Sequence, residues 1–98
     1  MSFPPEKVQA VWEKGRLVPG YDPRVVRQDV CGAWMVHNEY GNRSSALGWE
    51  VDHIDPTGGD GLPNLRPLQW ENNASKQNGP LTCPITASGR NNVRRVER

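Results

Sequence analysis

Residues 49–77, WEVDHIDPTGGDGLPNLRPLQWENNASKQ, decide the fold of this chain. Apolar and polar residues alternate from Trp49 to Ile54, which is typical of a half-buried strand. A glycine-rich connection over 55–63 leads to a second run of strand-forming residues, 64–70, in which a proline indicates an edge strand. Residues 71–77 favour a helix, which the following Asn-Gly-Pro would end. The stretch therefore predicts a strand, a loop, a second strand and a helix within an α+β fold.

Polar residues of this stretch stand where a metal site could be assembled. Asp52 and His53 are adjacent near the end of the first strand, Asn64 opens the second, and Asn73 precedes Lys76 by about one helical turn. Folding the helix against the hairpin would bring Asp52 and Asn73 together. A carboxylate and an amide oxygen are hard ligands that suit Mg²⁺ or Mn²⁺. Because a neutral imidazole can take a proton from water near pH 7, the set suits phosphodiester hydrolysis.

The order and spacing of these residues resemble the HNH endonuclease motif, which is a ββα-metal finger. The matching segments are Val51–Pro56, Gly58–Asp60, Asn64-Leu65 with Leu68, and Glu71–Asn73 with Lys76. Several elements recur in order, which makes the match more specific than a lone Asp-His pair. The resemblance implies a metal-dependent endonuclease that hydrolyses DNA phosphodiester bonds, of the small bacterial or phage type.

The resemblance also implies a role for each matched residue. His53 resembles the general base, and Asp52 and Asn73 resemble the two metal ligands. Asn64 resembles the residue whose side chain ties the loop together, and Lys76 matches a common basic position. Asn73 stands where many members have a second His, so this H-N-N variant favours Mg²⁺ or Mn²⁺ over Zn²⁺, with one ion per active site.

The number of active sites bears on the product of cleavage. One finger carries one site, so a monomer would nick DNA, and cutting both strands would need a homodimer, a partner subunit or two encounters. An alternative from another class stays open: a non-catalytic DNA-binding ββα-metal module that serves a larger nuclease or packaging complex. A purely structural site needs no free base, which argues against this alternative.

The rest of the first 78 residues predicts supporting elements. An apolar helical face predicts a helix over 5–14. An Asp-Pro pair typical of a helix start predicts a short second helix over 22–28. Residues 33–37 favour a short strand. We therefore expect one nuclease domain over 1–78, with its finger core at 49–77.

Charge is distributed unevenly along the chain. Residues 1–78 carry 8 Lys/Arg against 10 Asp/Glu, a net charge of −2, whereas residues 79–98 carry 4 Arg against 1 Glu, a net charge of +3. The latter segment has no convincing period, so we expect a flexible basic tail. Such a tail suits an anionic partner such as DNA, the alternative being a merely solvated segment. The candidate contacts to DNA phosphates are Arg66, Lys76, Arg90, Arg94 and Arg95.

Other candidate features receive plainer interpretations. The Gly-Gly-Asp-Gly run at 58–61 lacks the Lys-Ser/Thr of a P-loop, so we interpret it as the loop of the finger. Asp55 and Asp60 are interpreted as a loop residue and a turn residue. His37 and the four tryptophans are interpreted as packing residues.

Cysteine usage and hydropathy indicate the compartment. No apolar run of about 18 residues exists, so no membrane span is expected, and the N-terminus lacks the pattern of a signal peptide. We therefore expect a cytoplasmic protein of a bacterial host, encoded by the bacterium or a phage. Cys31 and Cys83 are interpreted as free thiols in a reducing compartment. No Cys-x-x-Cys pair indicates a zinc knuckle.

Overall fold

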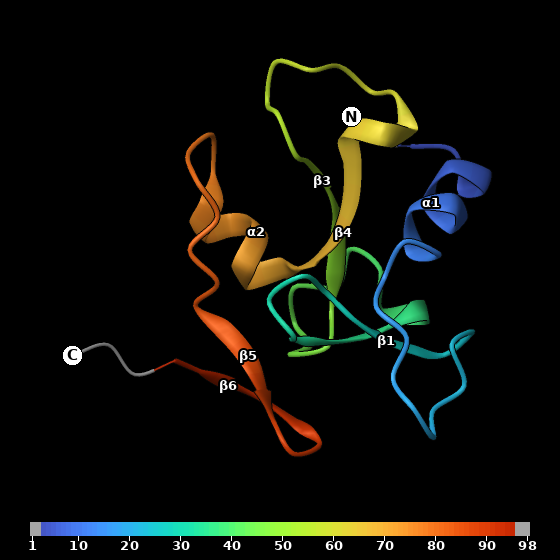
Figure 1. Ribbon diagram of the computed structural model, residues 1–98, viewed down its shortest axis with the longest axis vertical. Coiled ribbons are helices and arrows are strands. Elements are labelled where there is room, and N and C mark those ends of the chain that lie inside the picture. The colour runs from blue at the N-terminus through green and yellow to red at the C-terminus, as the bar shows by residue number, and fades with distance from the viewer. Residues whose placement is uncertain (1–2, 96–98) are drawn as a thin grey trace.

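The computed structural model describes residues 3–95, which form an α+β arrangement of two α-helices and three two-stranded antiparallel sheets (Figure 1). The elements are α1 (Pro5–Trp12), β1 (Val26–Gln28), β2 (Trp34–Val36), β3 (Trp49–His53), β4 (Leu65–Gln69), α2 (Trp70–Lys76), β5 (Ile85–Ser88) and β6 (Asn91–Arg94). A short 3-10 helix, His37–Glu39, follows β2, and a second one, Leu62–Asn64, precedes β4. Within the described range, no helix is long and apolar enough to cross a membrane.

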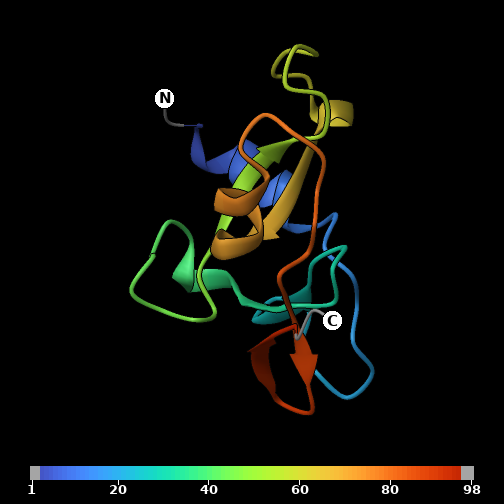
Figure 2. The same cartoon turned by 90° about the vertical axis from the view of Figure 1, so that its left-hand side faces the viewer.

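The predicted strand–loop–strand–helix unit is present as β3, β4 and α2. β3 and β4 pair antiparallel, with Asp52 opposite Arg66. The helix begins directly after β4 because the side-chain oxygen of Gln69 accepts hydrogen bonds from the backbone N–H groups of Glu71 and Asn72. These donors would otherwise have no partner in the first turn of a helix. The cap therefore turns the chain at the end of β4, and α2 lies beside the hairpin (Figure 2).

A hydrophobic core joins α1 and β2 to the β3–β4 hairpin. Its buried members are Val11, Trp12, Met35, Trp49 and Leu65. The Trp12 and Trp49 rings meet at a centroid distance of 5.1 Å. Both indole N–H groups find backbone carbonyls, on Pro23 and His37 respectively, so the rings are buried without an unpaired donor. This core supports the hairpin from the side of α1 and positions the end of β3.

A second, polar centre is built around the buried carboxylate of Asp29. One oxygen accepts the backbone N–H groups of Cys31 and Ala33, and the other accepts Gln69 N and Asn72 Nδ2. Burial raises the pKa of Asp29, and these hydrogen bonds oppose the rise. The carboxylate therefore links the β1–β2 turn to the end of β4 and the start of α2.

The helix expected over 22–28 is not formed. The Asp22 carboxylate instead accepts hydrogen bonds from the backbone N–H and the guanidinium of Arg24, which stabilises a turn. Residues 26–28 then pair with β2, Val26 opposite Val36. Pairing across the chain thus overrides the local preference for a helix start.

Two expectations for the C-terminal segment also differ from the structure. Residues 79–98 were expected to form a flexible tail, but β5 and β6 form a hairpin there, and residues 96–98 lie outside the described range. The Asn92 side chain bonds both the N–H and the C=O of Trp34 and so attaches the hairpin to β2. The expectation of two free thiols is wrong, because Cys31 and Cys83 form a disulfide with their Cα atoms 5.4 Å apart.

Candidate active site

A small polar pocket lies where the end of β3 meets α2. Its volume is about 190 Å³, and its lining residues are Val51, Asp52, His53, Pro56, Asn73, Lys76, Gln77 and Asn78. Four residues that the sequence singled out therefore share one pocket. They come together because β3 carries the acid and the imidazole while α2, turned back by its cap, carries the amide and the amine.

The Asp52 carboxylate is buried and has two cationic partners. Its Oδ2 accepts a hydrogen bond of 2.8 Å from Arg66 Nε, and its Oδ1 lies 3.3 Å from Lys76 Nζ. The Lys76 side chain is only 4% exposed and also donates to the carbonyl oxygen of His53 at 3.0 Å. One carboxylate therefore faces two cations, of which Lys76 lines the pocket. Arg66 and Lys76, expected as phosphate contacts, are thus anchored by Asp52.

His53 is half-buried, and a carboxylate from the β3–β4 loop holds its ring. The Nε2 atom lies 2.7 Å from Oδ1 of Asp60. The ring of Phe3 packs nearby, with centroids 6.0 Å apart. The sequence pattern indicates only a turn residue at Asp60 and does not predict this contact. The spacing of seven residues between the two side chains carries no regular period, so only the loop conformation reveals the pair.

Asn64 ties the loop together, as expected. Its Oδ1 accepts the N–H of Asp55, and its Nδ2 donates to the carbonyl oxygens of Asp55 and Gly59, each at 2.9 Å. The amide passes so close to Gly58 that a Cβ there would lie 2.8 Å from Asn64 Nδ2. A glycine is therefore required at position 58 for this side chain to span the loop.

The amide of Asn73 is oriented by Glu50 on β3. Asn73 Nδ2 donates to Glu50 Oε1 at 2.8 Å, and both oxygens of Glu50 accept hydrogen bonds from Arg43 at 2.7 and 2.8 Å. Burial raises the pKa of Glu50, but the hydrogen bonds from Arg43 and Asn73 outweigh it and leave the pKa below its usual value. Because the N–H group faces Glu50, Oδ1 is the atom of this amide that remains for a ligand.

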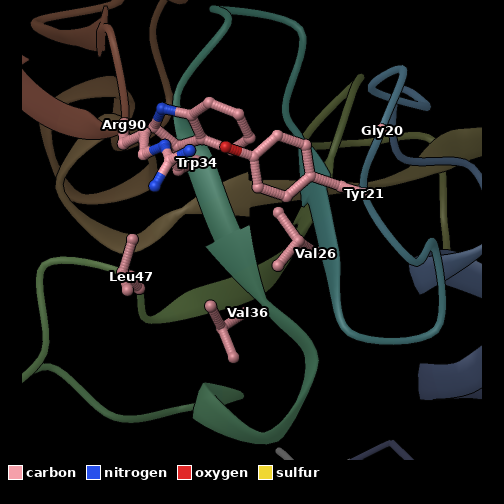
Figure 3. A pocket seen from close by; sticks show the side chains of 7 residues that line it. All are labelled: Gly20, Tyr21, Val26, Trp34, Val36, Leu47 and Arg90. Atoms are coloured by element: carbon pink, nitrogen blue, oxygen red, sulfur yellow. The ribbon is translucent and has the colours of Figure 1, made fainter.

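Three arginines near the C-terminus, Arg90, Arg94 and Arg95, do not line this pocket. The β5–β6 hairpin and the loop between β3 and β4 lie at opposite ends of the molecule (Figures 1 and 2). Arg94 pairs with Glu71 at 2.8 Å, and Arg95 contacts the carbonyl oxygen of Cys83. Arg90 lines a separate, largely apolar hollow of about 510 Å³ beside Trp34 (Figure 3). A phosphate bound by these arginines would therefore lie outside the pocket that His53 lines.

The donor set of the pocket fits a hard divalent ion that keeps much of its water. Asp52 offers a carboxylate and Asn73 an amide oxygen, which are the ligand types that Mg²⁺ and Mn²⁺ prefer. Among residues 3–95, no three or more His, Cys, Asp or Glu side chains gather into a metal cage. An ion here would rely on two protein oxygens and would share the Asp52 carboxylate with Arg66 and Lys76. That competition predicts weak binding of the ion.

Comparison of the chain with protein-family models, with curated proteins and with solved structures found no match.

Proposed function

We propose that this chain is a metal-dependent endonuclease that hydrolyses DNA phosphodiester bonds, with β3, β4 and α2 acting as an HNH-type ββα-metal finger. One observation carries the proposal: His53, Asp52 and Asn73 line a single polar pocket, although a loop and a whole strand separate Asn73 from the other two along the chain. A base and two hard oxygen donors around one small volume are the groups that metal-assisted hydrolysis of a phosphodiester requires.

Each side chain has a defined task in this proposal. His53 takes a proton from the water that attacks the phosphorus. Arg66 and Lys76, held in place by Asp52, supply positive potential for the scissile phosphate. A Mg²⁺ or Mn²⁺ ion held by Asp52 and Asn73 would neutralise charge on the phosphate and on the leaving 3′ oxygen. The resemblance to the HNH motif implies products with a 5′-phosphate and a 3′-hydroxyl. One site per chain implies nicking by a monomer, and a homodimer or partner subunit for cutting both strands.

A second candidate function is a DNA-binding module without catalysis, accessory to a larger nuclease or packaging complex. The paired state of Asp52 favours it, because a carboxylate that already has two cationic partners leaves less negative charge for a metal ion. The amine of Lys76, which lines the pocket, supplies a positive charge for a phosphate. The two candidates therefore differ in whether the bound DNA is cut.

A nicking assay on supercoiled plasmid with Mg²⁺, Mn²⁺ or EDTA separates the two functions. We expect nicking with either metal and none with EDTA. His53→Ala should reduce the rate by about 10²–10⁴-fold, because it removes the general base, and should leave DNA binding intact. His37→Gln is the matched control, since His37 contacts Gln9 and does not line the pocket. Binding of DNA without metal-dependent nicking would support the module instead, and His53→Ala activity within tenfold of the parent would contradict the assignment of the base.

A further inference from the structure

The loop between β3 and β4 brings a carboxylate to the candidate base. Asp60 Oδ1 lies 2.7 Å from His53 Nε2, a normal hydrogen-bond distance. A neutral imidazole has one N–H group, and an ionised carboxylate can only accept a hydrogen bond. The nitrogen that faces Asp60 must therefore carry the hydrogen, and the other nitrogen carries the lone pair.

We infer that Asp60 is a positioning residue, which holds His53 in the Nε2–H tautomer and so assigns Nδ1 as the atom that takes a proton from water. The inference rests on the proposed role of His53 as general base, and it names the nitrogen that acts. A ring free to rotate about its side-chain bonds would use either nitrogen as the base. The bond from Nε2 to Asp60 leaves Nδ1 as the nitrogen without this partner.

The backbone on both sides of this carboxylate is anchored. Lys7 of α1 donates to the carbonyl oxygen of Asp60 at 2.7 Å, and Asn64 donates to that of the preceding residue, Gly59, at 2.9 Å. A second lysine of the α1 region, Lys14, donates to the carbonyl oxygen of Leu62 at 2.8 Å. The loop is thus tied both to its own end and to α1. Such support reduces the freedom of the Asp60 carboxylate and fixes where it meets the ring.

The exposure of the His53 and Asp60 side chains indicates that their contact has a role other than stabilising the fold. The side chains of His53 and Asp60 are 34% and 49% exposed, and a polar contact so open to water contributes little to folding. The Phe3 ring also packs near His53, with centroids 6.0 Å apart. Removing the Asp60 carboxylate should therefore change the state of the imidazole while leaving the fold intact.

The test compares Asp60→Ala and Asp60→Asn with Asp55→Asn as the matched control. Asp55 belongs to the same loop, but its side chain bonds Thr57 and does not touch His53. Nitrogen-15 NMR of the imidazole reports the tautomer and the ring N–H directly. We expect the parent and Asp55→Asn to show one tautomer with a downfield, hydrogen-bonded N–H on Nε2. Asp60→Ala should lose that signal and show both tautomers.

Nicking kinetics provide the second measurement. Asp60→Ala should lower kcat by about 10–100-fold with an unchanged Kd for DNA, the range typical of a lost supporting contact. Asp60→Asn should recover most of the activity, because an amide oxygen can still accept the N–H. An Nε2–H signal that persists in Asp60→Ala would overturn the inference, as would a fall in DNA affinity that accounts for the lost activity. If the parent does not cleave DNA, the proposed function fails while the NMR measurement still tests the contact.

Discussion

Replacing Asp52 with Asn should destabilise the fold strongly, because the substitution leaves a buried cation without its charge partner. The Asp52 and Lys76 side chains are each 4% exposed, whereas Arg66 is 20% exposed and can turn towards water. Removing one partner of a buried pair costs about 3–5 kcal/mol. Since Arg66 can escape and Asn keeps the volume of the side chain, we expect a loss near the lower end, about 3 kcal/mol.

Urea unfolding followed by tryptophan fluorescence measures this loss. With a slope of about 1 kcal/mol per molar urea, typical of a small domain, the midpoint should fall by about 3 M. Lys76→Met is the control, since it leaves Asp52 paired with Arg66 and should cost less. In the Lys76→Met background, Asp52→Asn should cost about 1–3 kcal/mol less than in the parent. Additive effects, or a loss under 1 kcal/mol in the parent, would refute the argument that these charges depend on one another.

Three further changes test other parts of the structure. Replacing Cys31 and Cys83 with Ser should lower the free energy of unfolding by about 4 kcal/mol, because the disulfide closes a loop of 52 residues, and a reductant should then affect only the parent. Burial raises the pKa of Asp29. The stability advantage of the parent over Asp29→Asn should therefore shrink as the pH rises from the unfolded pKa of this group through the folded one. A constant difference in urea midpoints would contradict this expectation. Asn64→Ala should accelerate backbone hydrogen exchange across 55–63, and unchanged exchange would show that the side chain does not hold the loop.

Much of the hairpin and helix could be predicted because their signals are local. Alternation over 49–54 and a polar helix before Asn-Gly-Pro correspond to β3 and α2 within one or two residues. The role of Asn64 as the loop tie followed from the resemblance to a known motif, and the hydrogen bonds of its side chain agree with it. Local signals failed at 22–28, where a helix-start pattern gave way to pairing with a strand eight residues further on.

Sequence patterns could not predict the contacts between segments that are distant along the chain. The Cys31–Cys83 disulfide depends on the approach of the β1–β2 turn to the irregular segment before β5, which the sequence does not relate. Strands β5 and β6 have four residues each, too short for a clear period, and they are held by Asn92 against β2. The partners of the site residues were hidden for the same reason, since Glu50 acts on Asn73 across two elements.

The sequence by itself determined the chemistry available: an acid beside an imidazole, an amide about one helical turn before a lysine, and the strand, loop and helix that carry them. Only the tertiary structure decided which partners those groups bond and where they lie. It paired Asp52 with two cations, directed the Nε2 atom of His53 to Asp60, and left Arg90, Arg94 and Arg95 outside the lining of the pocket. The physical reason is that residue type and period act over a few positions. The partner of a charged or hydrogen-bonding group is set instead by whichever segment packs against it.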